Sequence, residues 1–268
     1  MPPVTESLRD RLYQTPGIVL QCRDLGEADR IYVVFTPGYG KASIIAKGAR
    51  RAKSRLGPYL DYFVEVTLNL TRGRDLDVVT GVVTVDQHPG LRGDLTAFAY
   101  ASHFAELVRD LTQEHQAHPG VYELLASSLS LLDQGVDPWH LARFFELHVL
   151  QLLGYRPELF QCANCQRDIQ AEPNVFSSVL GGVLCPECAP MDPGAIMLSV
   201  AAQKYLRTME RDGLSRVIGL RIGDDVRHQV ALAMASYLHA TSERPLRSLA
   251  ELPGLYIVDT VENGQDGR

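Results

Sequence analysis

The chain has 268 residues, of which 46% are hydrophobic and 22% are charged. This length exceeds what one hydrophobic core usually organises, so two or three domains are expected. No uncharged apolar stretch approaches the roughly 18 residues that a membrane-spanning helix needs, and the first residues lack the apolar core of a signal peptide. These features favour a cytoplasmic protein, in which cysteines are more often metal ligands than disulfides.

The net charge of −6 argues against a nucleic-acid partner, but the charge is unevenly distributed. Between Asp29 and Asp61 there is no acidic residue. The cations of this stretch are Arg30, Lys41, Lys47, Arg50, Arg51, Lys53 and Arg55. Charge asymmetry between regions is a better guide to a polyanionic partner than the overall charge, so this stretch is the candidate contact region.

Residues 1–86 are predicted to form a small β-barrel. Apolar runs over residues 17–22, 30–35 and 41–46 predict three strands, and a basic loop follows the third. Residues 61–70 and 76–85 predict two more strands, and alternation places Val64, Val66, Leu68 and Leu70 on one face. Five short strands favour a closed barrel, because closure removes exposed edges. An SH3-like barrel fits the same strand count.

Helical periodicity begins after a break at residues 88–90. Asp94 is a candidate N-cap of one helix, and Leu95 and Phe98 are among its apolar positions. Residues 121–132 predict a second helix. The pair Asp137-Pro138 starts a third, which has apolar residues on several faces and is therefore predicted to be central and buried. Residues 199–210 and 225–239 predict two more helices. The sequence therefore predicts an α+β multidomain protein, with an all-α helical domain over residues 87–159 and 191–250.

The strongest chemical signal is a pair of CxxC turns, Cys162 with Cys165 and Cys185 with Cys188, separated by nineteen residues. Each turn places two thiolates so that both can reach one tetrahedral zinc ion. With all four positions taken by protein, one structural zinc per chain is predicted, in a knuckle over residues 160–190. A redox site would need a single CxxC, and an empty site with cysteines packed in the core is the other alternative. The lone Cys22 is predicted to be an inert buried thiol.

The basic loop over residues 47–57 carries five positive side chains within nine residues. Its two glycines and small residues predict a mobile segment that would contact phosphates and release condensed counterions. Arg72 and Arg74, at a later turn, are predicted to extend the patch. Nearby aromatic residues, where exposed, would stack on unpaired bases; they are Tyr32, Phe35, Tyr39, Tyr59, Tyr62 and Phe63. A solvated turn beside core aromatics is the alternative interpretation.

The sequence contains none of the common catalytic motifs. The run Gly38-Tyr39-Gly40-Lys41 lacks the spacing of a phosphate loop, and neither an HExxH nor a GxSxG motif occurs. The histidines are scattered, with His140 and His148 predicted to serve packing. The sequence therefore predicts a binding protein and not an enzyme.

Several short motifs together resemble the bacterial RecO family of recombination mediators. They are Gly17–Leu20, Gly26–Arg30, Phe35-Thr36, Gly40-Lys41, Lys47–Ser54, Leu153–Leu159, the four cysteines with Phe176-Ser177 and Gly181-Gly182, and Arg244–Ser248. The resemblance covers nearly the whole chain apart from a polar tail over residues 251–268.

The resemblance implies an N-terminal OB-fold, a helical domain and a zinc knuckle packed on it. It also implies binding to single- and double-stranded DNA, annealing of complementary strands, and loading of the RecA recombinase together with RecR and single-strand-binding protein. The family's DNA-contact region carries over by motif onto Lys47, Arg50, Arg51 and Lys53. Lys41 and Arg55 are added on electrostatic grounds.

Two other functions fit parts of the sequence. A zinc-containing, sequence-specific transcription regulator would need a recognition helix, for which residues 225–239 with Arg227 and Gln229 are the best candidate. A nuclease or ligase-like repair enzyme is the second alternative, although Asp75 and Asp77 alone do not make a metal-dependent nuclease.

Overall fold

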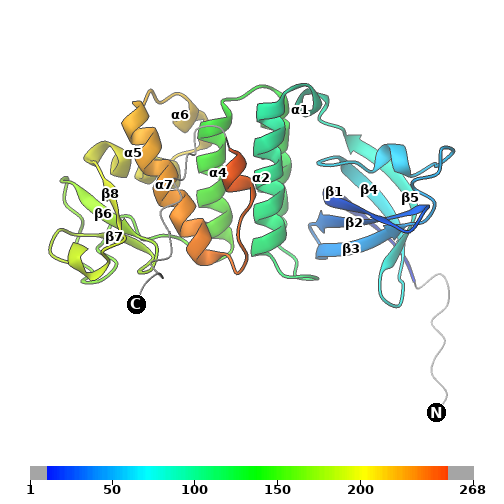
Figure 1. Cartoon of the computed structure of the whole chain (residues 1–268), viewed down its shortest axis with the longest axis horizontal. Helices are drawn as coiled ribbons and strands as arrows, with labels where there is room; N and C mark the ends of the chain where they lie inside the picture. The colour runs from blue at the N-terminus through cyan, green and yellow to red at the C-terminus, as the bar shows by residue number, and fades with distance from the viewer. Residues whose placement is uncertain (1–10, 253–268) are drawn as a thin grey trace, which may run out of the picture.

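The computed structural model describes residues 11–252. A β-barrel lies at one end, helices occupy the middle, and a small sheet with the cysteines lies at the other end (Figure 1). The polar tail predicted from residue 251 lies, from residue 253 onward, outside the described residues. Within residues 11–252, no helix combines the length and apolar character that crossing a membrane requires.

Five strands form the barrel: β1 (Leu12–Leu25), β2 (Asp29–Thr36), β3 (Gly40–Ala46), β4 (Glu65–Thr71) and β5 (Asp77–Asp86). Their order around the closed ring is β1-β2-β3-β5-β4, with β3 and β5 parallel and the other neighbouring pairs antiparallel. This five-stranded ring is OB-like, so the predicted fold of this region is confirmed. A 3₁₀ turn, η1 (Gly57–Tyr59), follows the basic loop.

The barrel interior follows the predicted alternation. Val64, Val66, Leu68 and Leu70 are each at most 2% exposed and pack with Tyr32 and Val34. Strand β1 is longer than the sequence predicted, because it starts at Leu12 and runs through Pro16. Its first half pairs with β4 and its second half with β2, so one long strand closes the ring.

The helical domain contains α1 (Pro89–Gly93), α2 (Leu95–Leu111), α3 (Pro119–Asp133), α4 (Pro138–Leu152), α5 (Val200–Arg211), α6 (Leu214–Ile218), α7 (Asp224–Thr241) and α8 (Ser248–Glu251). Helix α2 begins where predicted, since the Asp94 carboxylate accepts hydrogen bonds from the backbone N–H of Thr96 at 2.8 Å and of Ala97 at 3.2 Å. Asp137 caps α4 through the N–H of His140 at 2.9 Å. The short helices α1, α6 and α8 were not predicted.

Helices α2 and α4 form the centre of the domain, and the Phe104 and Phe145 rings stack at 4.2 Å between them. Helix α4 is buried on several faces, which confirms its predicted central position. Leu95, in contrast, is 89% exposed. It lies in the first turn of α2, where the helix has not yet entered the core.

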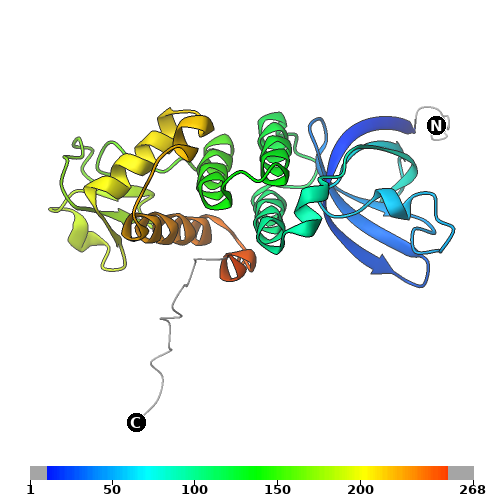
Figure 2. The same cartoon turned by 90° about the horizontal axis from the view of Figure 1, so that it is seen from above.

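The barrel and the helices share a packed boundary. Ile18, Leu20, Phe35 and Phe63 point outward from the barrel and belong to the same apolar cluster as the helical core. Seen from above, the two green helices α2 and α3 lie next to the barrel (Figure 2). The outer side of β1 and β2 is therefore covered by the helical domain.

The cysteine-bearing segment forms a three-stranded sheet of β6 (Asn174–Ser177), β7 (Gly182–Leu184) and β8 (Ile196–Leu198), in the order β7-β6-β8. Strands β6 and β7 form a hairpin between the two CxxC turns. Gly182 is required there, because a Cβ atom would lie 2.4 Å from the carbonyl oxygen of Glu158. Phe176 contacts Tyr237 edge-on and attaches the sheet to α7.

Candidate nucleic-acid interface and metal centre

The basic loop is folded back onto the barrel by hydrogen bonds. The Asp29 carboxylate accepts from the backbone N–H of Gly48 at 2.7 Å, and the N–H of Arg50 donates to the carbonyl of Ala28 at 2.9 Å. Farther along, the Ser54 hydroxyl oxygen accepts from the N–H of Gly57 at 3.0 Å. The sequence predicted an open, mobile segment, but these contacts form a series of turns. The loop therefore presents its side chains from a defined backbone.

All five of its predicted cations are exposed: Lys47, Arg50, Arg51, Lys53 and Arg55. Within residues 11–252, four of them form no ion pair, namely Lys47, Arg51, Lys53 and Arg55. Arg50 differs, because it pairs with the Asp24 carboxylate at 3.2 Å and donates to the carbonyl of Gly26 at 2.7 Å. Asp24 also pairs with Arg30, and it precedes the acid-free stretch in the sequence. The β1–β2 pairing brings it to this place.

Arg72 and Arg74 are also exposed, but they lie apart from the loop. Asp77 pairs with Ile44, so the turn before Asp77 lies toward the amino end of β3, whereas the loop follows its carboxyl end. Arg72 contacts the Tyr13 ring at 5.6 Å, and that ring packs against Tyr39 at 5.0 Å. The predicted patch is therefore two cationic groups and not one.

The aromatic residues named from the sequence divide into two sets. Core residues are Tyr32, Phe35 and Phe63, all at most 3% exposed, and partly exposed residues are Tyr39, Tyr59 and Tyr62 at 40%, 46% and 38%. The second set has ring faces that could stack on bases.

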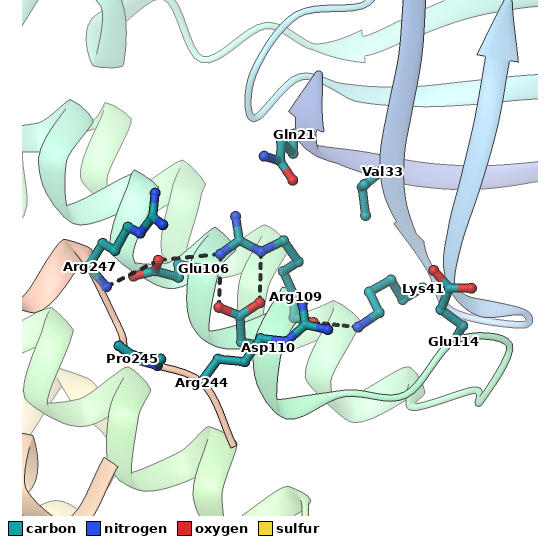
Figure 3. A pocket seen from close by; sticks show the side chains of 10 residues that line it. All are labelled: Gln21, Val33, Lys41, Glu106, Arg109, Asp110, Glu114, Arg244, Pro245 and Arg247. Carbon is teal, nitrogen blue, oxygen red and sulfur yellow. Dashed lines mark hydrogen bonds and ion pairs between the residues drawn. The ribbon is translucent and has the colours of Figure 1, made fainter. Parts of the chain in front are cut away.

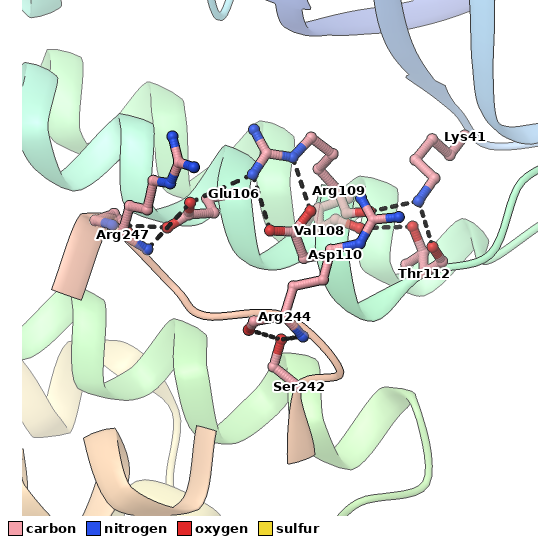
Figure 4. A network of polar contacts seen from close by, with 10 residues as sticks. Lys41, Glu106, Val108, Arg109, Asp110, Thr112, Ser242, Arg244 and Arg247 are labelled. Carbon is pink, nitrogen blue, oxygen red and sulfur yellow. Dashed lines mark hydrogen bonds and ion pairs between the residues drawn. The ribbon is translucent and has the colours of Figure 1, made fainter. Parts of the chain in front are cut away.

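Lys41 lies in the boundary between the barrel and the helices. Its ammonium donates to the backbone carbonyl of Thr112 at 2.5 Å and to that of Arg109 (Figure 4). Partial burial lowers the pKa of Lys41 from its ordinary value. Because these carbonyls end α2, Lys41 caps that helix and is not grouped with the loop cations.

Replacing Lys41 with methionine is expected to destabilise the chain by about 1–2 kcal/mol, since two helix-end carbonyls lose a charged donor. Urea denaturation followed by circular dichroism measures this change. Lys53→Met, which removes an exposed loop cation, is the matched control and should change the stability by less than about 0.5 kcal/mol. Equal midpoints for the two variants would contradict the capping role.

The four cysteines come together at the far end of the molecule. Their sulfur atoms all lie within 4.8 Å of one another, and Cys165 Sγ and Cys185 Sγ are 3.8 Å apart. Tetrahedral zinc with Zn–S bonds of about 2.3 Å requires sulfurs about 3.8 Å apart. The cluster is thus able to bind a metal such as zinc, with all four ligands supplied by the chain.

A polar neighbour favours the thiolate form of Cys165. The Arg167 guanidinium, which donates to Cys165 Sγ at 3.4 Å, lowers the pKa of that thiol to about 6. Arg167 is held in turn by Glu187, and the Asn164 amide donates to Cys188 Sγ at 3.3 Å. Such outer contacts orient metal ligands and balance their charge.

Helix α7 contains the residues considered for a sequence-reading helix. The Arg227 guanidinium lies 4.8 Å from the centre of the Trp139 ring, and the Gln229 side-chain oxygen accepts from the N–H of Ser199 at 2.8 Å. Both side chains are used within the domain, so this helix does not present them to a DNA groove. Asp77, considered for a nuclease site, accepts from Tyr13 and from the N–H of Gly73.

These features define a class of protein: an OB-like barrel with exposed cationic loops, joined to a helical domain that carries a four-cysteine cluster able to bind a metal. Two family profiles match the chain. "Recombination protein O N terminal" matches residues 11–88, and "Recombination protein O C terminal" matches residues 92–250.

Curated relatives agree with the profiles. A DNA repair protein RecO from Roseiflexus sp. (strain RS-1) is 38% identical over 245 residues, which are 91% of this chain and 86% of that protein. One from Symbiobacterium thermophilum is 37% identical, covering 88% of this chain and 95% of that protein. One from Dehalococcoides mccartyi (strain 195) is 33% identical, covering 91% and 96%. The chain belongs to the RecO family of DNA repair proteins.

Proposed function

We propose that the chain is a recombination mediator that binds single- and double-stranded DNA and anneals complementary strands. The observation that carries this proposal is a group of exposed barrel cations that form no ion pair within the described residues 11–252, namely Lys47, Arg51, Lys53 and Arg55. Cations in this state gain free energy from phosphate contacts through the release of condensed counterions. Arg72 and Arg74 supply a second group at the other end of β3.

The proposed mechanism needs no bond breaking. Two complementary strands repel each other through their phosphates, and a cationic surface that holds both reduces this repulsion. Exposed rings such as Tyr39 and Tyr59 offer stacking surfaces that keep bases unpaired until a complement arrives. RecR and single-strand-binding protein are the partners that this role implies, with recombinase loading as its outcome.

The metal cluster has a structural part in this proposal. Cys162 and Cys188 belong to the helical core, and the cluster lies at the opposite end of the molecule from the barrel (Figure 1). A zinc ion bound by the four thiolates would hold the two CxxC turns together. The DNA contacts would come from the barrel.

Strand annealing tests the proposal. Two complementary oligonucleotides, each with one fluorophore of a transfer pair, are mixed with the chain in the absence of nucleotide and of Mg²⁺. The rate of pairing is expected to rise at least tenfold above the spontaneous rate. A strict requirement for ATP, or no acceleration at any protein concentration, would contradict it.

A further inference from the structure

A groove runs along the boundary between the barrel and the helical domain. Its central cavity has a volume of about 670 Å³, and two smaller cavities of about 200 and 180 Å³ adjoin it. Arg109 lines all three, so they form one continuous depression. Gln21 and Val33 form the barrel wall, opposite residues 242–247, called here the strap, which connect α7 to α8 (Figure 3).

Two guanidinium groups of the strap are unpaired. Among residues 11–252, neither Arg244 nor Arg247 has an ion pair or a hydrogen bond from its side-chain nitrogens. Arg109, by contrast, is occupied by both oxygens of Asp110 at 2.8 Å and by Glu106 at 3.3 Å (Figure 4). The acidic wall residues that this network leaves unused are Glu114, Glu243 and Glu251.

The strap is held by a buried polar network. Glu106 accepts from the backbone N–H of Ser248 at 2.8 Å and of Arg247 at 3.3 Å. The Ser248 hydroxyl bonds His103 Nδ1 at 2.7 Å, and His103 Nε2 bonds Glu146 at 2.8 Å. His103 and Glu146 are completely buried, and burial of such groups is unfavourable unless they are paired. The network therefore fixes the backbone from which the arginines project.

Exposed aromatic rings lie at both ends of the groove. Tyr62, 38% exposed, lines one small cavity, and Tyr155, 48% exposed, lines the other. Cations in the middle and ring faces at the ends are the combination by which proteins bind single strands without sequence preference. Val33 of β2 and Lys41 of β3 line the groove, and strands 2 and 3 carry the face that OB-folds use for oligonucleotides.

We propose that this groove is a second binding site, for single-stranded nucleic acid, with Arg244 and Arg247 on phosphates and Tyr62 stacked on a base. The inference rests on the proposed function, because it gives the annealing protein a place for another strand segment. Lys41, at the amino end of β3, borders the groove, whereas the basic loop follows the carboxyl end of that strand. Seven residues of strand, about 20 Å, separate the two sites.

The salt dependence of binding to a fluorescent oligo(dT) tests this site on the full chain. The double variant Arg244→Ala/Arg247→Ala should bind at least tenfold more weakly, and its slope of log affinity against log salt should be shallower by about 1.4, because each lost single-strand phosphate contact contributes about 0.7. Lys204→Ala/Arg221→Ala removes two exposed cations outside the groove that form no ion pair within residues 11–252, and it is the matched control. Arg244→Lys/Arg247→Lys should restore the slope.

Tyr62→Ala provides a separate readout. Loss of stacking should weaken oligo(dT) binding about fivefold or more, with the salt slope unchanged and double-stranded binding unaffected. If both groove variants bind oligo(dT) like the control, the groove site is wrong. If the double variant instead loses only a labelled polyglutamate peptide, the groove is an acidic-peptide site and the proposal is also overturned.

The same titration separates the groove from the loop. Normal binding by the groove variants together with weakened binding by a loop variant overturns the groove site and leaves the proposed function intact. Weakened binding by the groove variants with a normal loop variant supports the groove and contradicts the loop. A wild-type chain that fails to bind oligo(dT) overturns both.

Discussion

Replacing Cys165 with serine should lower the melting temperature of the chain by about 10 °C or more. Zinc bound by four protein ligands contributes up to about 10–16 kcal/mol to folding in small zinc peptides, and even a third of this would give such a shift in a chain of this size. Cys165 is a suitable target, since its side chain is half-buried and its replacement leaves the packed Cys162 and Cys188 in place. Differential scanning calorimetry and metal analysis measure the effect.

Cys22→Ser is the matched control, because Cys22 lies outside the cluster, beside the barrel core. We expect one zinc per chain in the wild type and the control, and less than one in Cys165→Ser. Oligonucleotide binding well below the melting temperature should be equal in all three, because the barrel is at the other end of the molecule (Figure 1). A metal-free wild type with four titratable thiols and an unchanged melting temperature would refute the zinc site.

Reversing three loop charges, Arg51→Glu/Lys53→Glu/Arg55→Glu, should weaken binding to single- and double-stranded DNA by about 100-fold or more at low salt. Three phosphate contacts are lost, so the salt slope should become shallower by about 2 for single strands and about 3 for duplexes. All three side chains are exposed, so the fold should be retained. Fluorescence anisotropy over a range of NaCl concentrations gives both quantities.

The control reverses three exposed cations of the helical domain, Lys204→Glu/Arg216→Glu/Arg221→Glu, and changes the net charge equally. It separates a local contact from the general effect of a more acidic protein. Arg50→Ala should have a smaller effect than Arg51→Ala, because Asp24 already neutralises Arg50. Equal affinities of the loop variant and the control would exclude the loop as a DNA-contact site.

Local structure could be predicted from the sequence wherever a single physical rule determined it. Alternation placed Val64 to Leu70 on the inner face of the barrel, acidic caps located the starts of α2 and α4, and CxxC spacing identified the metal cluster. Each of these depends on residues close together in the chain. Helical periodicity also depends only on nearby residues. It places Leu95 on the apolar face of α2, but it does not indicate that the first turn of this helix lies outside the core.

The parts that could not be predicted depend on contacts between distant segments. Charge alone placed Lys41 with the DNA contacts, whereas the structure brings α2 to it across about 70 residues of sequence and uses its ammonium as a helix cap. The pairing of Asp24 with Arg50 and the placing of Arg244 beside the barrel are of the same kind. Such contacts leave no periodic signal in the sequence.

The apolar boundary shared by barrel and helices affects how the protein can be dissected. Ile18, Leu20, Phe35 and Phe63 face the helical core, so a fragment ending at Asp86 would expose them to water together. Exposed apolar patches of this kind cause self-association. An isolated N-terminal fragment that aggregates or binds nonspecifically would thus report the loss of its covering helices, and deletion mapping of activity should use point variants in the intact chain.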